Sequence, residues 1–140
     1  MILQSHIIER LKATTRGFNS FQGVMELAAI DDASFRPPAA FVAPVREQAG
    51  DNARPGTGAL RQVITETFAV VIVLASPARS AEVVQEALQG HWDQVMTALV
   101  NWTYPEAASE TVYAGGQLIR AQGGRVAYQM TFRFRHQITA

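Results

Sequence analysis

Apolar and polar positions alternate along this chain with two different periods. Near the start, Leu3, Ile7 and Leu11 recur at helical spacing with polar residues between them. This spacing predicts a one-faced helix over residues 2–15, which ends before Gly17. Farther along, Met25–Ile30 is a short apolar stretch that fits either a helical turn or a weak strand.

Two strands are predicted before the middle of the chain. Ala39–Val45 reads as a short strand, and its Pro44 belongs at an edge or a strand end because proline cannot donate to a ladder. Val63–Leu74 (VITETFAVVIVL) first alternates and is continuously apolar from Val70 onward. Such a strand starts exposed and ends buried on both faces, so we expect it at the centre of the sheet.

A second amphipathic helix is predicted over Ser80–Trp102, with Ser80 as its N-cap. Pro105 prevents its continuation. Gly90 in its middle costs about 1 kcal/mol relative to alanine and indicates a kink or a close helix-to-sheet contact. The apolar stripe of this helix consists of Val84, Leu88, Trp92, Val95, Met96 and Leu99.

The last third of the chain predicts a hairpin that turns at Gly123 and Gly124. In its returning strand, Val126–Ile138, apolar and polar residues alternate, so one face is buried and the other is polar. The order of elements predicts an α/β (α+β) sandwich. We expect a mostly antiparallel sheet of about four strands with two main helices packed on it.

Composition narrows the class of protein. The 140 residues suit one domain, residues 1–140, and 12 basic side chains balance 12 acidic ones. No overall field then attracts nucleic acid or an anionic membrane. Cysteine is absent, which excludes disulfides and thiolate chemistry. The longest apolar run, Phe68–Ala75, is far short of the roughly 20 residues that cross a bilayer, so no membrane role is expected.

The sequence offers no catalytic, metal or cofactor site. His6, His91 and His136 lack the spacing that would place two imidazoles on one metal ion, and we expect them to be separate surface residues. Nucleophile-elbow, phosphate-loop and dinucleotide-turn motifs are missing. We therefore expect a protein that is not an enzyme.

The first candidate interaction site is the polar segment Arg46–Arg61 (REQAGDNARPGTGALR), which predicts a long flexible loop or the tip of an extended hairpin. Connections of this length in a small domain tend to be functional or disordered. Arg54 and Arg61 would be its charged anchors. The candidate contact residues of this loop are Arg46, Glu47, Asp51, Asn52, Arg54 and Arg61.

The second candidate is the polar face of the last strand. Arg133 and Arg135 project from it together, with Arg120 and Arg125 near the same hairpin. A basic strand face can bind nucleic acid, but the aromatic residues that would stack on bases point to the opposite face. A solvated or subunit-facing surface that pairs with glutamates is the better interpretation.

Taken together, four segments resemble the tail terminator (tail completion) proteins of long-tailed bacteriophages and prophages. One departure is Asn101, because the family pattern has a glycine before the residue that matches Trp102. Whether the same turn forms with asparagine is not decided by the sequence. Each motif is degenerate alone, and their order and spacing carry the resemblance. The segments are PPAAFVAP at Pro37–Pro44, QVITETFAVVIVLAS at Gln62–Ser76, ALVNWTYPE at Ala98–Glu106 and YAGGQLIRAQGGRVAYQMTFRF at Tyr113–Phe134.

The resemblance implies a structural virion protein without cofactors. Such a protein forms a homo-hexameric ring on the head-proximal end of the tail tube, ends tube polymerisation and prepares the tail for head joining. Its partners would be its own copies, the tail tube protein and a head-completion or neck protein. DNA would pass through the ring without sequence-specific recognition, and assembly would take place in the host cytoplasm.

Two alternatives stay open at this point. A head-completion or neck adaptor protein shares the small size, the neutral charge and the lack of catalysis. A small-molecule-binding α/β module would instead place a pocket between helix and sheet, around Trp92, Trp102 and Tyr104.

Overall fold

The computed structural model describes residues 1–76 and 81–140, and a five-stranded sheet forms its centre. The order is β1-β2-β3-β5-β4, and β1 is parallel to β2 whereas all other neighbours are antiparallel. The α+β class and the central place of β3 are confirmed, with five strands in place of about four. The strands are β1 (Ser20–Gly23), β2 (Ala39–Ala49), β3 (Arg61–Ala75), β4 (Val112–Gln122) and β5 (Arg125–Thr139).

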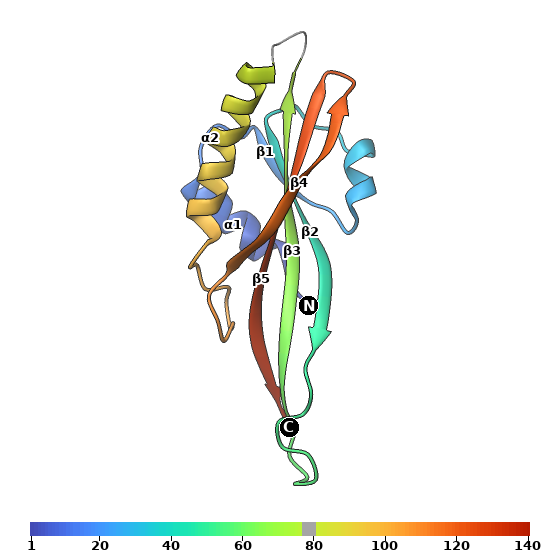
Figure 1. Cartoon of the computed structure of the whole chain (residues 1–140), viewed down its shortest axis with the longest axis vertical. Helices are drawn as coiled ribbons and strands as arrows, with labels where there is room; N and C mark the ends of the chain where they lie inside the picture. The colour runs from blue at the N-terminus through green and yellow to red at the C-terminus, as the bar shows by residue number, and fades with distance from the viewer. Residues whose placement is uncertain (77–80) are drawn as a thin grey trace.

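The sheet is covered on both sides (Figure 1). Helices α1 (Gln4–Thr14) and α2 (Ala81–Leu99) lie on one side, over the larger core. The 3₁₀ helix η1 (Leu27–Asp32) lies on the other side, over a smaller cluster that includes Phe41 and Val71. Both predicted helices are confirmed, and η1 resolves the ambiguous stretch as a helical turn. Within the described residues, no helix is long and apolar enough to cross a membrane.

Strand β2 is longer than predicted. It continues past Val45 to Ala49, and Arg46 pairs with Thr67 of β3. The four additional residues are polar or exposed because this end of the strand extends beyond the core, so hydrophobicity did not reveal it. The register shifts between Pro44 and Arg46, where β1 no longer covers the edge of β2, which accommodates the proline as predicted.

The predicted hairpin of β4 and β5 is confirmed. Gln122 pairs with Arg125, so the turn contains only Gly123 and Gly124, with φ angles of 65° and 72°. Positive φ at both central positions is characteristic of a type I′ turn, whose twist matches the twist of the flanking strands. The turn geometry therefore favours glycine at both positions.

The end of α2 explains the departure at Asn101. This residue follows the helix and has a φ of 68°, in the left-handed region that glycine occupies most easily. Asparagine is the second choice at such a position because its short side chain tolerates the left-handed conformation. The turn that a glycine would favour therefore forms with asparagine.

Of the two roles predicted for Gly90, a kink or a close helix-to-sheet contact, the structure contradicts the second. Helix α2 continues through it as one α-helix, and a Cβ atom built on it would have no heavy atom within 4 Å. The prediction of a close helix-to-sheet contact is therefore wrong, because this side of the helix faces away from the sheet. The predicted N-cap of α2, Ser80, lies outside the described residues.

We expect Gly90→Ala to raise the free energy of unfolding of the isolated chain by about 1 kcal/mol, since alanine restricts the unfolded chain and suits a helix interior. Urea denaturation followed by circular dichroism measures this change. Gly17→Ala is the matched control and should destabilise the chain, because Gly17 has a φ of 88° and its added Cβ would lie 3.3 Å from the His91 ring. A destabilising Gly90→Ala would contradict the open environment of this position.

Candidate interaction surface

Beyond the helices, three strands continue together as an arm (Figure 1). We define the arm as residues 46–49 of β2, 61–67 of β3 and 133–139 of β5, with residues 50–60 as its tip. The strands remain paired throughout, from Thr67 with Arg133 to Arg61 with Thr139. The sequence predicted either a loop or a hairpin tip over residues 46–61, and the hairpin is confirmed with a shorter tip.

The tip is held by hydrogen bonds of its own. Asn52 Oδ1 accepts the backbone N–H groups of Arg54 at 3.1 Å and Arg61 at 2.9 Å. Backbone groups of Leu60 and Ala140 bond each other in both directions, at 2.8 and 3.1 Å. Asn52 is thus a structural residue of the tip, whereas the side chains of Asp51 and Arg54 are exposed and form no ion pair within residues 1–76 and 81–140.

The arm places arginines from all three of its strands on one face. Arg46 and Arg133 flank Thr67 in one row across the sheet, and Arg135 lies in the next row on the same face. Directly opposed residues share a face, so we name Arg46, Arg133 and Arg135 the arginine face. All three side chains are exposed, and none forms an ion pair within residues 1–76 and 81–140. Arg61 lies farther along the same face by strand alternation.

The arginine face borders a shallow groove. Ser109 and Glu110, on the segment before β4, line this groove together with Arg133 and Arg135. The Ser109 hydroxyl accepts the backbone N–H of Arg135 at 2.8 Å, which fixes that segment beside the arm. The groove therefore lies between the arm and this segment, and Arg133, Arg135 and Glu110 contribute the charged groups of its lining.

The opposite face of the arm carries a compact charged cluster. The carboxylate of Glu66, which is 3% exposed, lies 2.9 Å from the Met1 amino group and 3.3 Å from His136 Nε2. Glu47 lies 2.8 Å from the same amino group. The hydrogen bond from the ammonium lowers the pKa of Glu47, and the bonds to Glu47 and Glu66 raise the pKa of the amino group. Each carboxylate of this cluster therefore has an ion-pair partner, unlike the arginines of the arginine face.

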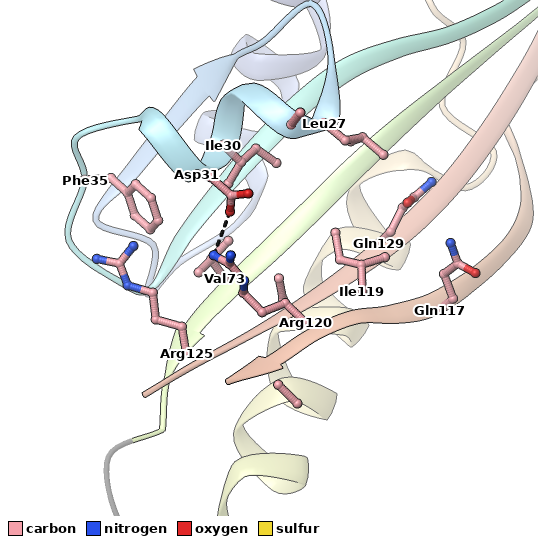
Figure 2. Close-up of a pocket in the computed structure, with 13 residues that line it drawn as sticks. Leu27, Ile30, Asp31, Phe35, Val73, Gln117, Ile119, Arg120, Arg125 and Gln129 are labelled. Atoms are coloured by element: carbon pink, nitrogen blue, oxygen red, sulfur yellow. Dashed lines mark ion pairs between the residues drawn. The ribbon is translucent and has the colours of Figure 1, made fainter. Parts of the chain in front are cut away.

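A second hollow of about 590 Å³ lies between η1 and the β4–β5 hairpin (Figure 2). Two cation contacts join its walls. Arg120 pairs with Asp31 at 2.6 Å, and the Arg125 guanidinium lies 4.5 Å from the centre of the Phe35 ring. These two arginines therefore hold η1 and the segment after it against the hairpin, and they do not extend the arginine face.

The aromatic residues proposed for a small-molecule pocket are engaged in packing. Tyr104 stacks on Phe134 at 4.5 Å between ring centres, and its hydroxyl accepts the Leu3 N–H at 2.8 Å. Trp92 meets Tyr113 edge to face at 5.8 Å. Trp92 lines one hollow together with Tyr128 of β5, and Tyr104 lines a different one beside His6 and Phe134. These contacts favour the core interpretation of the aromatics.

The three histidines lie apart, but they are not all lone surface residues. His136 contacts Glu66, as described above, and His91 packs against Phe18 with 4.6 Å between ring centres. Burial lowers the pKa of His91. In the described part of the chain, no group of three or more potential ligands is placed to hold a metal ion.

The structure thus brings together residues that the sequence assigned to two separate candidates. Arg46 and Arg61 from the predicted loop join Arg133 and Arg135 on one face, whereas Glu47 belongs to the opposite face. Sequence reasoning did not identify Glu66 and its contacts. The available signal was a glutamate two positions before the apolar run that starts at Phe68, and it did not reveal the partners.

Comparison with known proteins adds an independent observation. A family model described as phage tail terminator protein matches residues 2–140. Among solved structures, a chain of the virion of a native gene transfer agent particle has a TM-score of 0.56 and 15% identity, over 97% of this chain and 95% of that chain. At this identity, the likeness shows a shared fold. No curated protein matches the chain. Because the family model covers nearly every residue, the chain belongs to the phage tail terminator protein family.

Proposed function

We propose that this protein caps the head-proximal end of the phage tail tube as a homo-hexameric ring. The ring would end polymerisation of the tube and present a surface for the head-completion or neck protein. Membership in the tail terminator family gives the protein a structural role in the phage tail. Capping of the tube by a ring of six copies is the part of this role that we propose.

The observation that carries the proposal is the arm. Its arginine face and its tip project from the helical body, and the described residues of the monomer cover neither. A closed ring requires each copy to present two different patches, one to each neighbour, and capping requires a third surface toward the tube. A rigid arm with an unpaired cationic face and a separate polar tip can supply two of these surfaces.

The test is the distribution of tail lengths, measured by electron microscopy in lysates of the parent phage or prophage with this gene deleted. We expect overlong tubes without heads, and a plasmid copy of the gene should restore the normal length. Tails of normal length left unattached, or heads that leak DNA, would contradict capping and favour a neck adaptor.

A further inference from the structure

Two surfaces of opposite charge lie on opposite layers of this molecule. One is the arginine face, on the side of the sheet away from α2. The other lies on α2 itself, which has three acidic residues and no lysine or arginine between Ala81 and Leu99. The chain as a whole has a net charge of zero, so neither surface results from an overall excess of one sign of charge.

The acidic residues of α2 form one narrow stripe, which consists of Glu82, Glu86 and Asp93. With 3.6 residues per turn, their directions fall within about 40° of one another. They are exposed and lie opposite the buried side of the helix, which contains Val95 and Leu99. None of the three forms an ion pair within the described residues. We name them the acidic stripe.

Gly90 lies beside the acidic stripe, between Glu86 and Asp93. Its position has no packing requirement in the monomer, since a Cβ atom there would meet nothing within 4 Å. A glycine inside a helix is destabilising, and it exposes backbone to close approach from outside. The helix surface beside these two carboxylates is therefore uncovered in the monomer.

The arginine face has the complementary character. Arg46 and Arg133 flank one threonine, so two like charges lie in a single row, and neither forms an ion pair within the described residues. Guanidinium groups bind carboxylates through paired hydrogen bonds and are favoured at interfaces. A row of carboxylates on a helix is a suitable target for them.

We propose that the arginine face of one copy docks on the acidic stripe of α2 in the next copy. The proposal rests on the ring proposed above and identifies its subunit contact. Head-to-tail contacts in a ring join two different patches of the same chain. Here the two patches lie on opposite layers, so a copy can bind one neighbour with each. Charge complementarity also fixes the direction of the contact and disfavours pairing of like faces.

DNA is the other polyanion that an arginine face could meet. The described residues favour a second copy, because the chain has no net positive charge and already contains an acidic counterpart of matching size. The experiments below separate these two partners.

The first experiment uses the absence of cysteine in the chain, so that no native thiol of this protein can form a disulfide. Gln48→Cys lies on the arginine face beside Arg135, and Gln89→Cys lies beside the acidic stripe. Tails are purified from cells that carry each single variant or the double variant, and are separated on non-reducing gels. We expect a ladder of disulfide-linked copies only with the double variant. A ladder absent from the double variant, or dimers from either single variant, would overturn the proposal.

The second experiment reverses charges. The triple variant Arg46→Glu, Arg133→Glu, Arg135→Glu and the triple variant Glu82→Arg, Glu86→Arg, Asp93→Arg should each reduce the protein recovered on purified tails at least tenfold. The combined six-residue variant should restore the amount of protein on the tails, because the two surfaces are again complementary with their charges exchanged. The matched control Lys12→Glu, Arg16→Glu, Arg36→Glu changes the charge equally at exposed sites elsewhere and should bind normally.

The outcomes distinguish this inference from the proposed function. If the six-residue variant does not restore the amount of protein on the tails, the proposed subunit contact is wrong. If the arginine triple variant forms normal rings that retain less DNA, the arginine face binds DNA. If its normal rings detach from the tubes, the arginine face binds the tube. In each case tail lengths after gene deletion still decide whether the protein caps the tube.

Discussion

Replacing Phe132 with alanine should lower the free energy of unfolding by about 3–5 kcal/mol, the usual cost of removing a large aromatic side chain from a core. Phe132 is fully buried at the centre of β5. Its ring stacks on Phe68 with 5.6 Å between ring centres and meets Tyr113 at 5.5 Å. One substitution would therefore leave a cavity shared by three strands, β3, β4 and β5.

Domains of this size are stable by about 5–15 kcal/mol, so the loss would be a large part of the total. Urea denaturation of the purified variant measures it. Leu118→Ala, on β4 but 55% exposed, is the control and should change the free energy of unfolding by less than about 0.5 kcal/mol. A similar small change for Phe132→Ala would contradict the placement of this ring in the core.

Replacing residues 51–60 with a short Gly-Ser turn should abolish tail completion and leave the fold intact. None of these residues is buried, and β2 and β3 keep all their paired residues in this variant. The hydrogen bonds of Asn52 and the backbone bonds between Leu60 and Ala140 are lost, but they stabilise only the tip and the adjoining terminus. We therefore expect a normal circular dichroism spectrum and a thermal midpoint within a few degrees of the parent.

Complementation of the deleted gene measures the functional part of this prediction. The shortened protein should give the same overlong tubes as the deletion. As a control, Gly123→Asn keeps an Asn-Gly turn at the other end of the molecule and should complement fully, because asparagine followed by glycine suits the same turn type. Normal tail lengths from the shortened protein would show that the tip contributes nothing to completion.

The sequence predicted well those elements whose periodicity is strong. The apolar stripe of α2 and the change of pattern along β3 each depend on which side chains are buried, and burial is what hydrophobic patterning records. Strand β1 has only four residues, Ser20–Gly23, and gives no usable pattern. The extension of β2 to Ala49 was missed because its residues are polar, and its pairing is made by backbone groups.

The arginine face illustrates a different limit. Arg133 and Arg135 could be placed together from alternation within one strand. Their proximity to Arg46 depends on the register between three strands, which local sequence does not encode. The hydrogen bonds of Asn52 and the contacts of Glu66 likewise join residues that are distant in sequence. The family resemblance predicted the general role of the protein. The complete arginine face could be recognised only from the pairing of the strands in the fold.

The pairing of β3 with β5 has a consequence for how the chain folds. Its partners are 50 to 78 positions apart in the sequence, and β5 is the last element made. At a synthesis rate of about 5–20 residues per second, a completed β3 waits roughly 3 to 13 seconds until its second neighbour is complete. During that time β2 protects one edge, while the other edge of the most apolar strand stays open. Aggregation of nascent chains should therefore begin at Phe68–Leu74, and slower β5 synthesis should increase it.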